Sequence, residues 1–223
     1  MRSPLVSCLC VTRGSLDLAR ECFAAQTYPN LELVIVQGSP EWPELHLKER
    51  ELEVLTGPEP LTLGARRNLG ARAARGAYIA VWDDDDWHAP DRIEHQMEHM
   101  HGFANVLDQI GIYDQQEHEA YAVKRFWENT LLIPRDKLLR HPYTQRDRGE
   151  DTDVINKLQA LGGGIGKVPT NDAVRYVYSI HGTNCWPREH YGHFFRREDR
   201  LQAAEADRFA ELLQLRSKLS EPQ

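Results

Sequence analysis

Three short, almost continuously apolar segments lie in the first half of the chain, and they leave few folds open to it. They cover residues 5–11, 31–36 and 77–82, and each runs directly into polar residues. Segments of this kind are typical of strands that are buried on both faces, as in parallel sheets. Helical periodicity over residues 16–26 and 61–75 separates them. We therefore expect parallel strands joined by right-handed crossovers in one α/β domain.

The remaining elements are less sharply defined. Residues 38–60 are rich in Pro and Glu and contain only a short strand candidate, at 53–55. Further along, the pattern predicts a helix from Pro90 towards Asn105, a strand or hairpin region over 120–133, a helix over 152–161, a strand over 173–179 and a last helix over 197–219. The sequence thus predicts a single α/β domain over residues 1–223, with a mostly parallel but mixed central sheet flanked by helices.

Composition and charge exclude several classes of protein. The chain has 27 Lys and Arg residues against 34 Asp and Glu, a formal charge of −7, which disfavours nonspecific binding to nucleic acid. No apolar run approaches the roughly 20 residues of a transmembrane helix, and the first four residues lack a signal-peptide pattern, so we expect a cytoplasmic protein. The four cysteines form no CxxC pair and are expected to be reduced and space-filling.

Four consecutive aspartates, at residues 83–86, follow the third apolar segment directly. Adjacent carboxylates repel one another and are costly to bury unless cations or donors compensate their charge. Hard oxygen ligands suit Mg²⁺ or Mn²⁺, and ligands of parallel sheets lie beyond the carboxyl ends of the strands. The alternative is a solvated acidic turn that caps the helix near Pro90.

Several motifs together resemble one family. The sequence reads Asn-Leu-Gly at 68–70, Ala-Arg-Gly-Ala-Tyr-Ile at 74–79 and Asp-Asp-Asp-Asp-Trp at 83–87, preceded by Gln-Thr-Tyr-Pro-Asn at 26–30. In this order they resemble the inverting family 2 glycosyltransferases of GT-A fold, over roughly residues 5 to 190. The resemblance implies a GT-A-like fold and transfer of a sugar from a nucleotide-diphospho-sugar donor to a hydroxyl of a glycan, a lipid-linked molecule or a small molecule.

The resemblance also divides the chain and assigns a metal site. Residues 1–115 would bind the nucleotide sugar, 116–196 would face the acceptor, and 197–223 would form the C-terminal helix. The aspartates match the family's DxD motif, which holds a divalent ion, Mn²⁺ or Mg²⁺, against the diphosphate. By position, Asp83 and Asp85 are the expected ligands, Asp85 the more direct one, and Asp84 contacts the donor. His181 lies in a segment similar to the family's HG.NTW stretch and would complete the metal shell or contact the diphosphate.

A second acidic motif supplies the expected base. Glu150 and Asp151 resemble the family's "ED" motif at the start of a helix. An inverting transfer needs a carboxylate that takes the proton of the attacking hydroxyl, so the resemblance makes Asp151 the catalytic base, with Asp153 as the fallback. The alternative is that Asp151 or Thr152 caps the helix and the acidic residues favour its positive end.

Nucleotide binding is expected at the first two strand ends. Thr12 matches the Thr of the family's opening motif, whereas its neighbours Val11, Arg13 and Gly14 depart from that motif. Gln37 stands where the family usually has an Asp that pairs with the base, commonly uracil; an amide can both donate and accept. Arg67 is expected to place positive charge in the donor site, although other arginines of its helix are expected to face water.

Aromatic residues are candidates for the acceptor side, because an aromatic face suits a sugar ring. For each candidate taken alone, packing in the core is the favoured interpretation; the candidates are Trp87, Trp127, Trp186 and Tyr191. His95 and His99 have the four-residue spacing of a zinc pair, but without a third ligand an exposed polar helix face is the favoured interpretation. The last helix, with mixed charges, is expected to dock on its own domain and not on a membrane or another subunit.

Two other functions fit parts of the sequence. A catalytically silent module that binds a sugar nucleotide or a cation is the main alternative, because the residues at positions 13 and 37 depart from the family pattern. A nucleotidyltransferase ranks behind it, because no Gly-rich phosphate loop with Arg and Lys follows the first strand.

Overall fold

The three apolar segments form neighbouring strands in the computed structural model, which describes residues 3–38, 44–57, 60–101, 103–161, 164–171 and 174–214. Strand β1 (Val6–Thr12) pairs in parallel with β2 (Leu31–Gln37) on one side and with β5 (Tyr78–Val81) on the other. The chain runs from β1 to β2 on one side and later returns to place β5 on the other side of β1. The carboxyl ends of β1 and β5 therefore form a topological switch point, where ligands of open α/β sheets bind.

These strands belong to a mixed sheet with the order β11-β7-β10-β5-β1-β2-β4-β3. Parallel pairs outnumber antiparallel ones in it, which confirms the predicted sheet type. Its other strands are β3 (Glu44–Lys48), β4 (Glu51–Leu55), β7 (Asn105–Leu107), β10 (Leu132–Pro134) and β11 (Gly166–Val168).

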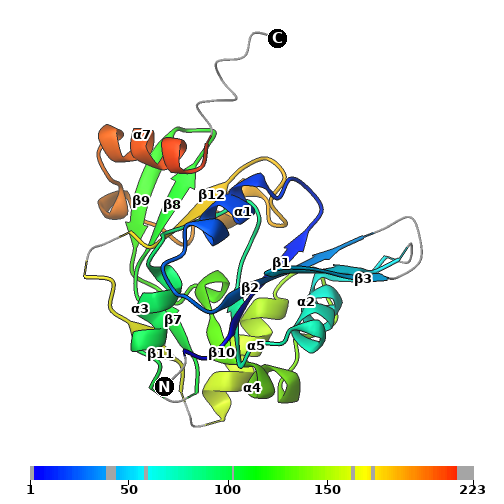
Figure 1. Ribbon diagram of the computed structural model, residues 1–223. Helices are drawn as coiled ribbons and strands as arrows, with labels where there is room; N and C mark the ends of the chain where they lie inside the picture. The colour runs from blue at the N-terminus through cyan, green and yellow to red at the C-terminus, as the bar shows by residue number, and fades with distance from the viewer. Residues whose placement is uncertain are drawn as a thin grey trace.

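Helices cover both faces of this sheet, because successive strand residues point to opposite faces. Cys8 and Cys10 pack with helices α1 and α3, whereas Leu9 packs with α2, α4 and α5. Figure 1 shows these two layers on either side of the strands. The helices are α1 (Asp17–Ala24), α2 (Leu63–Ala73), α3 (Arg92–Glu98), α4 (Arg135–Arg140) and α5 (Glu150–Ala160).

A second, smaller sheet, which the sequence did not predict, has the order β6-β12-β8-β9. Helix α7 lies on it, with Phe209 buried against Gly111 (Figure 1). This part of the chain contains β6 (Trp87–His88), β8 (Ile110–Asp114), β9 (Glu119–Val123), the 3-10 helix η1 (Glu128–Thr130), β12 (Tyr176–Ile180), α6 (Arg188–Tyr191), the 3-10 helix η2 (Arg197–Asp199) and α7 (Ala203–Leu212).

Several predicted boundaries were wrong. The helix expected over 197–219 begins at Ala203, because the preceding Leu201 donates its backbone N–H to the carbonyl oxygen of Ala120 in β9, at 2.8 Å. Residues 215–219 lie outside the described residues. The helix expected from Pro90 to Asn105 ends at Glu98. The region over 120–133 is not one hairpin but β9 and the start of β10, separated by η1. Residues 44–55 form a hairpin, β3–β4.

The cysteines are free thiols, and those of β1 and α1 are buried. Burial raises the pKa of Cys8 to about 12 and that of Cys22 to about 11, so both stay neutral and act as apolar side chains. Among the described helices, none is long and apolar enough to span a bilayer. The cytoplasmic location stays a prediction.

Candidate active site

A cavity of about 1070 Å³ lies beyond the carboxyl ends of β1, β5 and β12. The N-terminus of α5 and the short helix η1 form its opposite wall, so the two acidic motifs of the sequence meet in one place. Its acidic lining residues are Asp17, Asp83, Asp84, Asp85, Glu128, Asp147, Glu150 and Asp151. Its cationic lining residues are Arg13, Arg66, Arg67, Arg125 and Arg148, and two histidines, His181 and His190, also line it.

The four aspartates of the acidic turn have different environments. Asp86 is fully buried and accepts hydrogen bonds from the hydroxyl of Tyr176 and, at 2.9 Å, from the backbone N–H of Ser179. It therefore ties the turn to β12 and does not line the cavity. Asp84 accepts a hydrogen bond from the hydroxyl of Thr12. Thr12 is 1% exposed and is not a lining residue, so in this structure its hydroxyl holds Asp84 at the cavity wall.

Asp83 is held by two neighbours. Its Oδ1 lies 3.4 Å from Nη2 of Arg67, and its Oδ2 accepts a hydrogen bond from the amide of Asn129. Burial raises the pKa of Asp83 to about 7, although Arg67 opposes the shift. The charge of Asp85 raises the pKa of Asp83 further, because a second carboxylate close by disfavours ionisation. The turn thus carries more negative charge than its protein neighbours neutralise.

Arg67 connects this turn to the second acidic motif. Its Nη1 lies 3.0 Å from Oε1 of Glu150, while Nη2 faces Asp83, and all three side chains are largely buried. The guanidinium also lies over the ring of Tyr143, 5.4 Å from its centroid. Arg67 lines the cavity, as a donor-site cation would, but its position between two carboxylates makes it also the link between β5 and α5.

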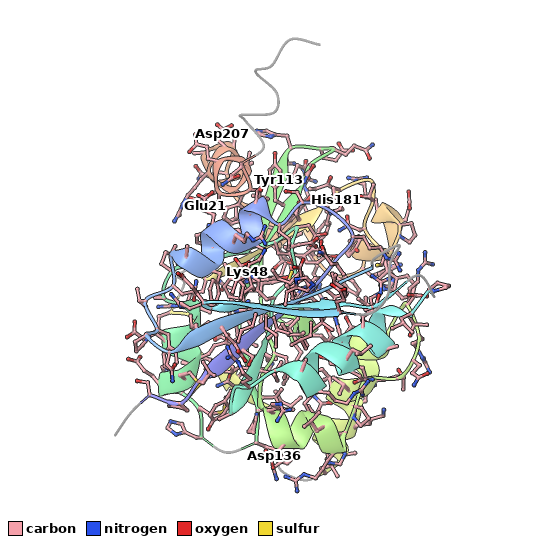
Figure 2. All side chains as sticks on the ribbon, turned by 45° about the vertical axis from the view of Figure 1, so that its right-hand side comes forward. Glu21, Lys48, Tyr113, Asp136, His181 and Asp207 are labelled. Atoms are coloured by element: carbon pink, nitrogen blue, oxygen red, sulfur yellow. The ribbon has the colours of Figure 1, made fainter. Side chains whose placement is uncertain are left out.

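The side chain of Asp85 is 42% exposed, against 16% for that of Asp83. Nε2 of His181 lies 2.9 Å from its Oδ2. The backbone N–H of Thr183 donates to Nδ1 of His181, at 3.3 Å, so in the neutral ring Nε2 carries the hydrogen and donates it to Asp85. His181 lies on the opposite side of the larger sheet from Asp136 of α4 (Figure 2).

This donor set fits a hard divalent ion. Asp85 presents carboxylate oxygens to the cavity, and the carboxylates around it carry uncompensated charge, which is the environment that Mg²⁺ and Mn²⁺ prefer. Ligation by His181 through Nε2 requires the tautomer with the hydrogen on Nδ1. In that tautomer Nδ1 can donate a hydrogen bond to the hydroxyl oxygen of Thr183, 2.9 Å away.

Asp151 lies half-buried on the first turn of α5, in the cavity wall. Its Oδ1 accepts the backbone N–H of Thr152 at 2.7 Å, and the Thr152 hydroxyl donates to Glu128 at 3.2 Å. Burial raises the pKa of Glu128, and the charge of Asp151 raises it further. Asp153 points elsewhere: it binds Thr144 and Arg146 and does not line the cavity.

Two residues of the site were not predicted from the sequence. Glu128 and Asn129 lie on η1, a single turn of 3-10 helix that has no periodicity to reveal it. Gln37, which was predicted, lies at the end of β2, where its amide donates to Glu53 of β4. It does not line the cavity, so its role in base recognition stays a prediction.

Some of the aromatic candidates line the cavity and one does not. Trp127, Trp186 and Tyr191 line the cavity, and Trp87 instead packs in the core between α7 and the larger sheet. Trp127 is 5% exposed and stands edge-on to Tyr178, with 5.0 Å between centroids. Its Nε1 is a buried donor that has no hydrogen-bond partner among the described residues.

Comparisons with known proteins agree with this geometry. The model of the family described as "Glycosyl transferase family 2" matches residues 11–161. A putative glycosyltransferase, EpsH, from Bacillus subtilis is 35% identical over 105 residues, which are 44% of this chain and 30% of that protein. An uncharacterized glycosyltransferase, RP339, from Rickettsia prowazekii is 30% identical over 131 residues, 55% of this chain and 41% of that protein. The matches thus span less than half the length of these relatives.

The fold is similar to that of S. aureus TarS. The crystal structure of its residues 1–349 superposes with a TM-score of 0.55 and 13% identity, over 78% of this chain and 60% of that one. The structure of the same protein in complex with UDP gives a TM-score of 0.56, also at 13% identity, over 95% and 71% of the two chains. At this identity the likeness concerns the fold, which is the predicted GT-A-like arrangement.

Proposed function

Because the chain belongs to glycosyltransferase family 2, we propose that it transfers a sugar, with inversion, from a nucleotide-diphospho-sugar to a hydroxyl and uses Mn²⁺ or Mg²⁺. One observation carries the proposal: Arg67 joins Asp83 of the acidic turn to Glu150, the neighbour of the proposed base, in the wall of one cavity. The group that binds the donor and the group that activates the acceptor are therefore held at a fixed separation.

The acidic turn would bind the metal and the diphosphate. Asp85 is the proposed direct ligand, with Asp83 and His181 beside it and Asp84 towards the donor. When bound, the ion neutralises charge that develops on the departing nucleoside diphosphate. Arg67 keeps Asp83 in place.

Asp151 is the proposed base. It takes the proton of the acceptor hydroxyl as that oxygen attacks the anomeric carbon on the face opposite the leaving diphosphate. Its half-exposed position in the cavity wall supports this role, and the contacts of Asp153 with Thr144 and Arg146 disfavour the fallback. Glu128, half-buried beside it, is a positioning residue through Thr152.

The donor nucleotide would enter over the ends of β1 and β2. Of the two residues predicted to bind the nucleotide, Thr12 would act through Asp84, which it holds at the cavity wall, and Gln37 would have to release Glu53 to reach the base. A UDP complex is known for the structurally similar TarS. The hydroxyl acceptor would lie against the aromatic wall of Trp127, Trp186 and Tyr191, whose ring faces suit the axial C–H groups of a sugar.

The test is release of nucleoside diphosphate from a panel of nucleotide sugars, with Mn²⁺ or with EDTA. We expect metal-dependent turnover of a preferred donor. Asp151→Asn should lower it by about 10²- to 10⁴-fold, the usual contribution of a general base, while donor binding persists. Asp136→Asn, on the far side of the sheet, is the control and should retain activity (Figure 2).

Two results would contradict the proposal. Full activity of Asp151→Asn together with loss in Asp153→Asn would transfer the role of base to the fallback residue. Metal-dependent donor binding by the wild type with no turnover of any donor, whether by hydrolysis or in the presence of acceptors, would instead favour the silent binding module.

A further inference from the structure

The last turn of α3 carries three side chains that can bind a metal. His95, Glu98 and His99 each offer one ligand atom, and these atoms all lie within 4.8 Å of one another. Residues three and four apart share one face of a helix, so the cluster follows directly from the helical backbone. None of the three lines the cavity of the candidate active site. The structure thus adds Glu98 as the third ligand that the sequence pattern of two histidines lacked.

Hydrogen bonds to backbone carbonyls fix the tautomers of both histidines. Nε2 of His95 lies 2.8 Å from the carbonyl oxygen of Pro169, and Nδ1 of His99 lies 2.8 Å from the carbonyl oxygen of His95. A carbonyl oxygen only accepts, so these two nitrogens carry the hydrogens. In the neutral rings Nδ1 of His95 and Nε2 of His99 therefore keep their lone pairs. Metal-binding histidines use this arrangement, in which the other ring nitrogen donates to a carbonyl.

Glu98 leaves its carboxylate available. Its side chain is exposed, and no hydrogen bond or ion pair joins it to another of the described residues. The two imidazoles are close and tilted, with ring centroids 4.5 Å apart and an interplanar angle of 53°. Both are half-buried. The three ligand atoms, within 4.8 Å of one another, are close enough together to surround one zinc ion, which lies about 2.0–2.2 Å from each ligand in a tetrahedral shell.

We propose that His95, Glu98 and His99 form a Zn²⁺ site, with a water in the fourth position. Two imidazoles and one carboxylate suit zinc, whereas Mg²⁺ and Mn²⁺ prefer the all-oxygen groups of the acidic turn. His95 already joins α3 to Pro169, in the connection between β11 and β12. Zinc bound here would hold the C-terminal end of α3 and this connection more firmly, and so stabilise the folded chain.

The experiment is calorimetric titration of Zn²⁺ into the metal-free chain, in buffer with excess Mg²⁺ to occupy the acidic turn. We expect one Zn²⁺ to bind to the wild type, and affinity to fall at least tenfold in Glu98→Gln and in His99→Asn. His101→Asn is the matched control, because this exposed histidine of the same segment is outside the trio; it should bind as the wild type does. Thermal unfolding without zinc checks that each variant folds.

A second readout is the zinc-dependent rise in Tm, which we expect in the wild type and His101→Asn and not in Glu98→Gln. Because Glu98 is exposed, this variant retains the apolar core. The proposal is overturned if the wild type binds no Zn²⁺ under these conditions, or if Glu98→Gln and His99→Asn both bind it as tightly as His101→Asn. These outcomes are independent of glycosyl transfer, since no step of the assay uses a donor or an acceptor.

Discussion

Replacement of Arg67 by Met removes the cation between two buried carboxylates and keeps a side chain of similar length. Side chains of Arg67 and Glu150 are 7% and 3% exposed, and that of Asp83 is 16% exposed. Removing one partner of a buried ion pair leaves the other charge uncompensated and costs about 3–5 kcal/mol. We expect Arg67→Met to lower the free energy of unfolding by this amount at about pH 8, where both carboxyls are ionised in the unfolded chain.

The loss of unfolding free energy caused by Arg67→Met should be smaller at acidic pH. Burial holds the pKa of Asp83 at about 7 and raises that of Glu150 above its ordinary value. Loss of Arg67 raises both further. Because these pKa values lie above those of the unfolded chain, the native state binds more protons between about pH 4 and pH 7, and its stability falls as pH rises through this window. At about pH 5 the carboxyl of Asp83 is largely protonated, which removes one of the two orphaned charges, and the cost should fall to about 1–3 kcal/mol, near that of an unpaired buried polar group.

Urea denaturation, monitored by tryptophan fluorescence, measures the loss of unfolding free energy at both pH values. The control is Arg20→Met, which breaks a bidentate pair with Glu51, at 3.1 and 3.0 Å, on the surface. Because Arg20 is 45% exposed, that change should cost less than about 1 kcal/mol. The reasoning is refuted if Arg67→Met costs no more than the control, or if its cost is the same at both pH values.

Three shorter predictions follow from single contacts. Asp85→Asn should weaken Mn²⁺-dependent binding of a nucleoside diphosphate at least about tenfold in calorimetry; equal affinity would remove Asp85 from the metal shell. Tyr176→Phe deletes a donor to buried Asp86 and should cost about 1–3 kcal/mol in urea denaturation, whereas an unchanged midpoint would contradict the role assigned to Asp86. Gly64→Ala places a Cβ 1.9 Å from the carbonyl oxygen of Thr144 and should cost about 1–3 kcal/mol; wild-type stability would show that this contact relaxes freely.

Strands β1, β2 and β5 of the larger sheet could be predicted because their signal is local. In β1, Cys8 and Cys10 face one helix layer and Leu9 the other, so apolar residues follow one another without the alternation of a half-exposed strand. In the second sheet the sequence predicted a strand over 173–179, where β12 lies, but not the strands that pair with it. β6 contains only two residues, and β12 pairs Val177 with Gly111, far away in sequence. Such pairing depends on tertiary contacts that no short window contains.

The sequence predicted which residue types gather at the site, but not the environment of each residue. Four identical aspartates stand in a row, yet Asp86 is fully buried and the side chain of Asp85 is 42% exposed. That difference comes from β12, whose Tyr176 and Ser179 bind Asp86 across a long stretch of sequence. Likewise Gln37 follows its strand as predicted, but its amide faces Glu53 of the unpredicted hairpin.

The decisive measurement is anomalous diffraction from a crystal soaked with Mn²⁺ and a nucleoside diphosphate. We expect one manganese peak in the large cavity at about 2.2 Å from an Asp85 oxygen and from the diphosphate, with the Asp151 carboxylate facing the space on the other side of the leaving oxygen. A bound nucleotide whose manganese contacts none of the four aspartates, or that lies outside this cavity, would contradict the account.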